Sequence, residues 1–245
     1  YPFPDPLAEG RWELAQRISQ KYKNDYYVIG DLEACLFELS WNLTGLDKFL
    51  IDLTMEVDYI FELLDRVLDY SITCGIKMID LGADMIWAGD DFGTQRGMMI
   101  SPDMWRTYFK PRMKKMFDAF KAHKPDIKIA YHSCGSIFPI VGELVEIGLD
   151  VLNPIQPAAK DMDLHILKEL YASQLAFFGG VDVQEILPRG SEEEIAQEVK
   201  DKILAGGKNG GYIIAPAHNI QPDTSNENVF TFFREAKKIG QYPLT

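Results

Sequence analysis

Polar side chains capable of chemistry follow six short apolar runs of the sequence. The segments in question combine Gly or Pro with an acid, amide, imidazole or thiol: Gly30-Asp31-Leu32-Glu33, Gly89-Asp90-Asp91, His132-Ser133-Cys134-Gly135, Asn153-Pro154-Ile155-Gln156, Gly179-Gly180-Val181-Asp182 and Ala215-Pro216-Ala217-His218. One such segment means little, because turns and helix caps favour the same residues. Six in succession indicate the rim of an active site.

The sharpest local pattern is His132-Ser133-Cys134. Residues two apart on an extended segment point the same way, so both side chains can reach one metal ion. Imidazole nitrogen and thiolate sulfur are ligands that zinc prefers, and a third protein ligand leaves one position open. His218, after the last apolar run, is the candidate third ligand. On spacing alone, a packed cysteine beside a hydrogen-bonded histidine is the more common situation.

Three carboxylates are candidate catalytic groups. Asp90 and Asp91 are adjacent, and one of two paired carboxylates can have a raised pKa and act as an acid. The alternative is that one caps the next segment while the other pairs with Arg96. Asp182 follows Gly179-Gly180, where the backbone can approach a ligand closely. Its alternative role is a helix cap.

The other polar residues near these positions are candidates for substrate binding: Asp31, Arg96, Asn153 and Gln156. His123 and His165 lie in helix-like stretches and are expected to be surface or structural residues. Cys35 and Cys74 are expected to be buried small hydrophobic residues.

The apolar runs that precede these segments predict strands. Each is short and rich in β-branched or aromatic residues, as in a strand buried on both faces: Tyr26–Ile29, Ala83–Trp87, Ile127–Tyr131, Leu149–Leu152, Leu175–Phe178 and Gly211–Ile214. Helical stretches separate them. Strands that alternate with helices predict an α/β fold with a parallel sheet.

Local signals mark the helices. Ser101-Pro102-Asp103 opens a helix to about Ala122, with a kink or break at Pro111, and Ser191 opens one that ends near Gly206-Gly207. Ser225–Lys238 is the last helix. The stretch 46–82 predicts two helices with a break between Leu53 and Val57.

The fold class expected is a TIM-type (β/α)8 barrel, as one domain over residues 1–245. A closed barrel needs eight strands and six are visible, so two strands are expected to precede Tyr1. The alternative is an open doubly wound sheet, but no glycine-rich phosphate loop follows the first strand.

Composition narrows the possible partners. The 245 residues carry a net charge of −12, which argues against binding nucleic acid or an anionic membrane face. No apolar run approaches the ~20 residues of a membrane helix. Three cysteines are too few for a disulfide framework, so we expect the protein to lie in a reducing cytoplasm. The expected partner is a small-molecule substrate.

From about Tyr26 onward the sequence resembles the uroporphyrinogen decarboxylase superfamily, which also contains cobalamin-linked methyltransferases such as methylcobamide:coenzyme M methyltransferase. The matching blocks keep the family's order: LGADMIWAGDDFGTQRGMMISPDMWRTYFKPRMKK, YHSCGSI, GLDVLNPIQP, FFGGVDVQEILPRG and GGYIIAPAHNIQPDTSNENV. The resemblance implies an enzyme on a barrel.

The two branches of the superfamily imply different sites. In the methyltransferase branch, a His-x-Cys after a middle strand binds zinc with a later Cys, where this sequence has His218 instead. The decarboxylase branch has a His at that late position, where it serves the substrate, and lacks the His-x-Cys. That branch has Asp-Ser-Trp-Ala-Gly where this chain has Asp90-Asp91.

The leading expectation is therefore a zinc-dependent methyltransferase that moves a methyl group between a corrinoid protein and a thiol. Zinc deprotonates a coordinated thiol at neutral pH, whereas decarboxylation of a porphyrinogen needs no metal. The alternatives are a tetrapyrrole decarboxylase and a non-catalytic tetrapyrrole- or corrinoid-binding protein. The decarboxylase would need several arginines at the strand ends, where only Arg96 and Arg189 stand.

Overall fold

The computed structural model describes residues 1–244, and their contacts divide the chain into two compact units. The first contains Tyr1–Asp91, Ile100–His132 and Glu146–Leu149. The second contains Phe92–Met99, Ser133–Val145 and the chain from Asp150 onward. Each unit is described here by its own elements.

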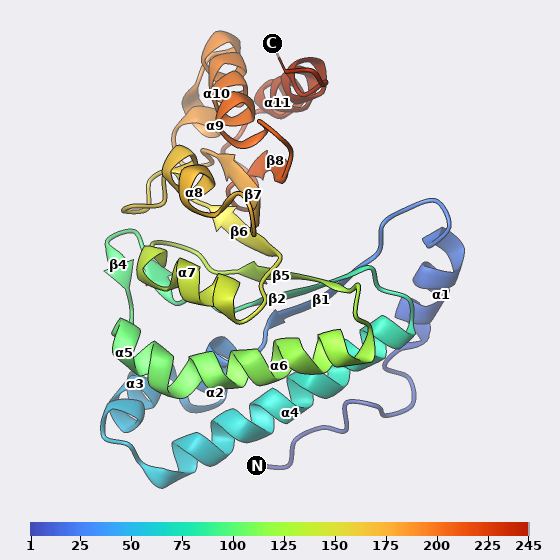
Figure 1. Cartoon of the computed structure of the whole chain (residues 1–245), viewed down its shortest axis with the longest axis vertical. Helices are drawn as coiled ribbons and strands as arrows, with labels where there is room; N and C mark the ends of the chain where they lie inside the picture. The colour runs from blue at the N-terminus through green and yellow to red at the C-terminus, as the bar shows by residue number, and fades with distance from the viewer. Residues whose placement is uncertain (245) are drawn as a thin grey trace. The chain divides into compact units, whose positions relative to one another are not determined.

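Strands and helices alternate along the chain, as the colour gradient of Figure 1 shows. Six strands form two parallel sets, in the order β1-β2-β5 in the first unit and β6-β7-β8 in the second. Their bounds are β1 Ile29–Ala34, β2 Met85–Gly89, β5 Lys128–His132, β6 Val151–Ile155, β7 Ala176–Val181 and β8 Tyr212–Pro216. The α/β class and the six parallel strands predicted from the sequence are confirmed.

The helices of the first unit are α1 (Glu13–Tyr22), α2 (Phe37–Thr44), α3 (Leu46–Thr54), α4 (Asp58–Asp80), α5 (Pro102–Met104) and α6 (Lys110–His123), with a π-helical turn η1 (Trp105–Phe109) before α6. The predicted breaks are confirmed at both places. The first lies between α3 and α4. The second lies at Pro111, which lacks an N–H and stands in the first turn of α6.

Figure 1 shows α4 and α6 running side by side in the first unit. Leu64 and Val67 of α4, with Phe117 and Phe120 of α6, are buried in that unit's core. Gly75 lets the two helices approach closely, because a Cβ there would lie 2.4 Å from the Phe120 ring. The long helix thus supports the strands on which the site residues stand.

The second unit is built on α8 (Leu164–Tyr171), α9 (Ile186–Arg189), α10 (Glu192–Gly206) and α11 (Asn226–Ile239), and α7 spans Phe138–Glu146. Ser191 and Glu194 form a capping box at the start of α10, and Ser225 caps α11, as their sequence signals predict. A buried cluster joins α9, α10 and α11 to β7: Val181, Leu187, Ile195, Val199, Ile203 and Phe232. A short antiparallel hairpin of β3 (Gly93–Thr94) and β4 (Gly97–Met98) belongs to the same unit.

The strands begin and end later than the sequence predicts. The largest difference is at β1, predicted over Tyr26–Ile29 but found over Ile29–Ala34. Tyr26 is 66% exposed, and the pairing with β2 starts only at Ile29. Strand limits are set by pairing partners, and an apolar run alone does not fix them.

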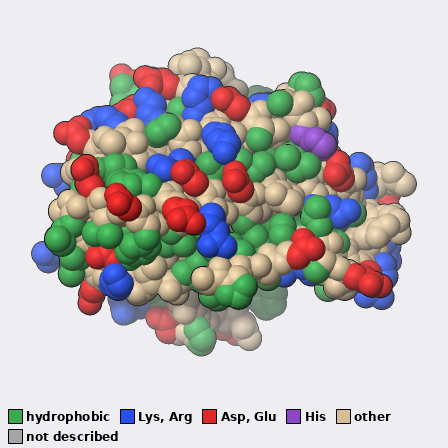
Figure 2. Space-filling model, turned by 90° about the horizontal axis from the view of Figure 1, so that it is seen from below, with side chains coloured by type: hydrophobic (Ala, Val, Ile, Leu, Met, Phe, Trp, Pro, Cys, Tyr) green, Lys and Arg blue, Asp and Glu red, His purple; other side chains and the backbone are tan. Residues whose placement is uncertain are grey.

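No helix in the described part of the chain combines the length and the apolarity that a membrane span needs. On the face shown in Figure 2, acidic and basic side chains are interspersed with hydrophobic ones. That face therefore lacks the clustered positive charge of a nucleic-acid-binding surface.

Candidate metal and substrate site

Two of the three predicted metal ligands come together in the second unit, where a ligand atom of Cys134 lies within 4.8 Å of one of His218. The third, His132, belongs to the first unit. His132 is the last residue of β5, Cys134 follows two residues later in the same chain, and His218 comes two residues after β8. His132 and Cys134 are half-buried, and His218 is exposed.

These residues fit a zinc ion in type and spacing. Zinc–nitrogen and zinc–sulfur distances of about 2.0 to 2.3 Å place tetrahedral ligand atoms roughly 3.5 Å apart. The ligand atoms of Cys134 and His218, which lie within 4.8 Å of each other in the second unit, need only a small inward movement. His218 has one further requirement, because its Nδ1 accepts the backbone N–H of Asn219 at 2.8 Å. Its ring would exchange that bond for a metal, or turn, which its exposure allows.

His132 is held by the end of β2. The backbone N–H of Asp90 donates to the His132 carbonyl at 3.0 Å, and Asp91 Oδ1 lies 3.6 Å from His132 Nε2. The Trp87 ring is tilted against the imidazole, with centroids 6.3 Å apart. A Cβ at Gly89 would come within 2.9 Å of the His132 Cβ, so glycine permits this close approach.

Asp90 follows β2 as predicted, but its carboxylate is completely buried. Oδ1 accepts the backbone N–H groups of Leu36 and Glu38, while Oδ2 accepts the hydroxyl of Tyr131 and the thiol of Cys35. Burial raises its pKa to about 6, against the lowering effect of these hydrogen bonds. Asp90 therefore caps the start of α2, which corrects the expectation that it lines an open pocket.

Glu38, in the first turn of α2, is a candidate that the sequence patterns do not reveal. Burial, and then the charges of Asp91 and Asp90, raise its pKa to about 7, although its carboxylate accepts the Asp91 backbone N–H. A carboxyl group that titrates near neutral pH suits proton transfer. Its only sequence signal is its position just after a strand, which is too weak to single it out.

Asp182 directly follows β7, and its Oδ1 accepts the backbone N–H groups of Gln184 and Glu185 at 2.6 and 3.1 Å. These bonds close a turn before α9 (Ile186–Arg189), whose N-cap is Glu185 and has no side-chain cap, so Asp182 does not cap this helix. Gln156 directly follows β6 and accepts the Gly135 N–H. Gln156 and Asp182 line the same hollow, but its volume of about 10 Å³ holds roughly one water molecule.

Two of the other substrate-binding candidates, Asp31 and Asn153, lie within strands and not after them. Asp31 lies in the middle of β1, opposite Trp87, and is exposed. Asn153 lies inside β6, is 6% exposed, and its amide donates to the carbonyl of Phe178. Arg96 is exposed in the turn between β3 and β4. No described contact joins these three residues.

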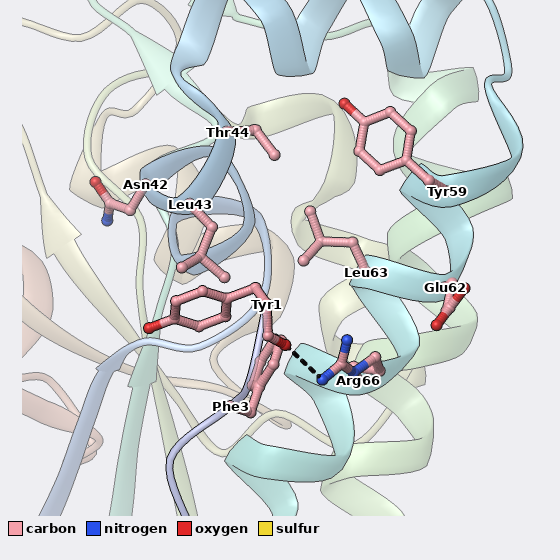
Figure 3. Close-up of a pocket in the computed structure, with 9 residues that line it drawn as sticks. All are labelled: Tyr1, Phe3, Asn42, Leu43, Thr44, Tyr59, Glu62, Leu63 and Arg66. Carbon is pink, nitrogen blue, oxygen red and sulfur yellow. Dashed lines mark hydrogen bonds between the residues drawn. The ribbon is translucent and has the colours of Figure 1, made fainter.

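A larger cavity of about 400 Å³ lies within the first unit, away from these residues (Figure 3). Its walls come from the first residues of the chain, the end of α2 and the first turns of α4. The guanidinium of Arg66 donates to the carbonyl of Tyr1 and lies over the ring of Phe3. The Arg66 guanidinium thus contacts two residues that themselves line the cavity, Tyr1 and Phe3.

The sequence model of uroporphyrinogen decarboxylase matches residues 8–239, across both units. The chain belongs to the uroporphyrinogen decarboxylase family. A uroporphyrinogen decarboxylase of Prochlorococcus marinus is 24% identical over 183 residues, which are 75% of this chain and 47% of that protein. A chloroplastic uroporphyrinogen decarboxylase 2 of rice is 27% identical over 65% of this chain and 38% of its own length. The chain thus spans about half the length of the curated relatives it matches or less.

A methyltransferase from Methanosarcina mazei has a similar fold, with a TM-score of 0.75 and 23% identity over 91% of this chain and 62% of that one. A dihydropteroate synthase from Anaplasma phagocytophilum shares the fold more distantly, with a TM-score of 0.53 and 13% identity over 89% of this chain and 76% of that one. These likenesses support the barrel-type fold class predicted from the sequence.

Proposed function

We propose that this member of the uroporphyrinogen decarboxylase family is a zinc-dependent methyltransferase that moves a methyl group between a corrinoid protein and a thiol. The observation that carries the proposal is the approach of Cys134 and His218 to within 4.8 Å in the second unit, with His132 two residues before Cys134 in the sequence. Two imidazoles and a thiol form a ligand set that zinc prefers, with a fourth position open to a substrate.

The residues would divide the work as follows. Cys134 and His132 would hold the ion from the end of β5, and His218 would complete the set. A zinc ion there would lower the pKa of a thiol substrate, making it a nucleophile at neutral pH. Glu38, with a pKa of about 7, is the carboxyl group near Asp91 able to take up a proton.

Two further observations support the methyltransferase. The fold resembles the methyltransferase from Methanosarcina mazei over 91% of this chain. The His-x-Cys motif, which the decarboxylase branch lacks, stands at the end of β5. The methyl donor that we propose is a corrinoid protein, and the methyl acceptor that we propose is a thiol.

The second candidate is a tetrapyrrole decarboxylase, the activity named for the curated relatives. One observation favours it. Because His218 Nδ1 accepts the Asn219 N–H, the proton of the neutral ring is on Nε2, ready to donate to an anionic substrate. In this alternative His218 would contact the substrate and would not bind a metal.

Zinc binding separates the two candidates. We would measure the metal content of protein purified without chelators, then titrate the apoprotein with zinc against a chromophoric chelator. Wild type should bind one zinc ion, and Cys134→Ser and His132→Ala should each weaken binding at least tenfold. His165→Ala and Cys74→Ser serve as matched controls, since these residues lie in α8 and α4.

Turnover provides the second test. Wild type loaded with zinc should transfer a methyl group from methylcobalamin to a small thiol, and Cys134→Ser should not. Release of CO2 from uroporphyrinogen by the metal-free protein would favour the decarboxylase. Absence of zinc binding by correctly folded wild type would overturn the proposal.

A further inference from the structure

Four residues in and just after the end of β2 lie close to one histidine, His132. Gly89 is the register partner of His132, and the Asp90 N–H donates to the His132 carbonyl. On the ring itself, Trp87 packs against the imidazole and the Asp91 carboxylate faces Nε2 at 3.6 Å. All of these groups belong to the first unit, so the arrangement depends only on the pairing of β2 with β5.

We infer that Asp91 is the positioning residue of the metal site: its carboxylate accepts the Nε2–H of His132, so that Nδ1 is the nitrogen offered to the metal. This rests on the proposed function. The inference assigns Asp91 a role different from the catalytic one expected from the sequence. A carboxylate on the outer nitrogen of a metal-binding histidine fixes the tautomer and raises the basicity of the ligand nitrogen.

The distance supports a carboxylate poised for this bond. At 3.6 Å the two atoms lie just beyond hydrogen-bond distance, so a small rotation of either side chain closes the contact. The backbone of Asp91 is fixed by a hydrogen bond, because its N–H donates to the Glu38 carboxylate. The Trp87 ring lies beside the imidazole, with the ring centroids 6.3 Å apart.

A different assignment would make Asp91 a metal ligand, with His132 Nε2 as its neighbour in the coordination sphere. The two assignments differ in which ring nitrogen carries the proton. They also differ in how many protein ligands the ion has. Both differences can be measured without any enzymatic assay.

The test compares wild type with Asp91→Ala, Asp91→Asn and the control Asp126→Asn, an exposed aspartate in the loop before β5. Zinc affinity is measured by chelator competition. Loss of an outer carboxylate typically costs about 10- to 100-fold in metal affinity, and we expect that loss for Asp91→Ala. Asp91→Asn should lose less, because its amide oxygen can still accept the Nε2–H. Asp126→Asn should bind zinc as wild type does.

Two spectroscopic readouts complete the test. The absorption spectrum of Co²⁺-loaded Asp91→Asn should keep the shape of the wild-type spectrum, because the ligand set is unchanged. Long-range ¹H–¹⁵N correlations of zinc-loaded wild type should show a protonated Nε2 and a metal-bound Nδ1 on His132. A changed Co²⁺ spectrum, a metal-bound Nε2, or equal zinc affinity in wild type and Asp91→Ala would each overturn the inference. If wild type itself binds no zinc, the proposed function fails with it.

Discussion

At the scale of single residues, two adjacent aspartates have unlike environments. Asp90 is completely buried with four hydrogen-bond donors around its carboxylate, whereas Asp91 is half-buried beside His132. Adjacent residues at the end of a strand point to opposite faces, so one turns toward the core and the other toward the site. Asp90 therefore stabilises the fold through its buried hydrogen bonds, whereas Asp91 faces the imidazole of His132.

The role of Asp90 predicts a stability change. Asp90→Ala leaves the buried N–H groups of Leu36 and Glu38 without an acceptor. Each unpaired buried group costs about 1 to 3 kcal/mol, so we expect the loss of both acceptors to lower the free energy of unfolding by about 2 to 6 kcal/mol. Asp90→Asn should cost less, because its Oδ1 can still accept both N–H groups. Urea denaturation followed by circular dichroism measures the difference.

The exposed Asp126→Ala is the control for that series and should leave stability within about 0.5 kcal/mol of wild type. Equal stability of Asp90→Ala and wild type would show that water or another group replaces the carboxylate. The capping role assigned to Asp90 would then be wrong.

The candidate site was predictable from sequence only in part. The trio of His132, Cys134 and His218 carries its own signal, because its residue types suit a metal and its members follow strands. Glu38 carries no such signal, because its pKa is raised by burial and then by the charges of Asp91 and Asp90, which lie far along the chain. A pKa shift that is caused by residues distant in the sequence cannot be predicted from a local sequence pattern.

At the scale of elements, helices were predicted more accurately than strands. The limits of α10 depend on signals within its own segment, the Ser191 capping box at its start and Gly206-Gly207 at its end. The limits of β1 depend on pairing with β2, including a register shift between Asp31 and Glu33. Asp31 and Asn153 were misplaced for that reason, since both lie within strands.

The contact between α4 and α6 gives a prediction at this scale. Alanine is a better helix former than glycine by roughly 0.5 to 1 kcal/mol, so Gly75→Ala would stabilise an isolated α4. In the protein the added Cβ would lie 2.4 Å from the buried Phe120 ring. Overpacking of this kind costs about 1 to 3 kcal/mol, so we expect Gly75→Ala to lower stability.

A double-mutant cycle with Phe120→Leu identifies the cause. Phe120→Leu opens a small cavity, and the Cβ of Gly75→Ala can occupy part of it. The double variant should therefore be more stable than the sum of the two single effects predicts. Strict additivity in urea denaturation would mean that α4 and α6 do not meet at these residues.

At the scale of the whole molecule, the family match covers residues 8–239 while the chain spans 47% of the Prochlorococcus marinus relative. All three candidate ligands nevertheless belong to this chain, and two of them, Cys134 and His218, lie within 4.8 Å of each other in the second unit. Metal binding can therefore be tested on the chain as it stands, independently of methyl transfer, which also needs a corrinoid partner. The net charge of −12 leaves such a partner possible, since only nucleic acid and anionic membranes are disfavoured.

Zinc should stabilise the folded chain as a whole. The three ligands come from the end of β5, the segment after it and the segment after β8, so an unfolded chain does not present them together. A ligand that binds only the native state stabilises it by about 2.7 kcal/mol when its free concentration is a hundredfold above Kd. We expect the thermal midpoint of wild type to rise by several degrees on saturation with zinc, and a chelator to reverse the rise.

Cys134→Ser should show little change, and the His165→Ala control should respond as wild type does. A midpoint that rises equally in Cys134→Ser would mean that zinc binds elsewhere, and the ligand set proposed for this protein would be wrong.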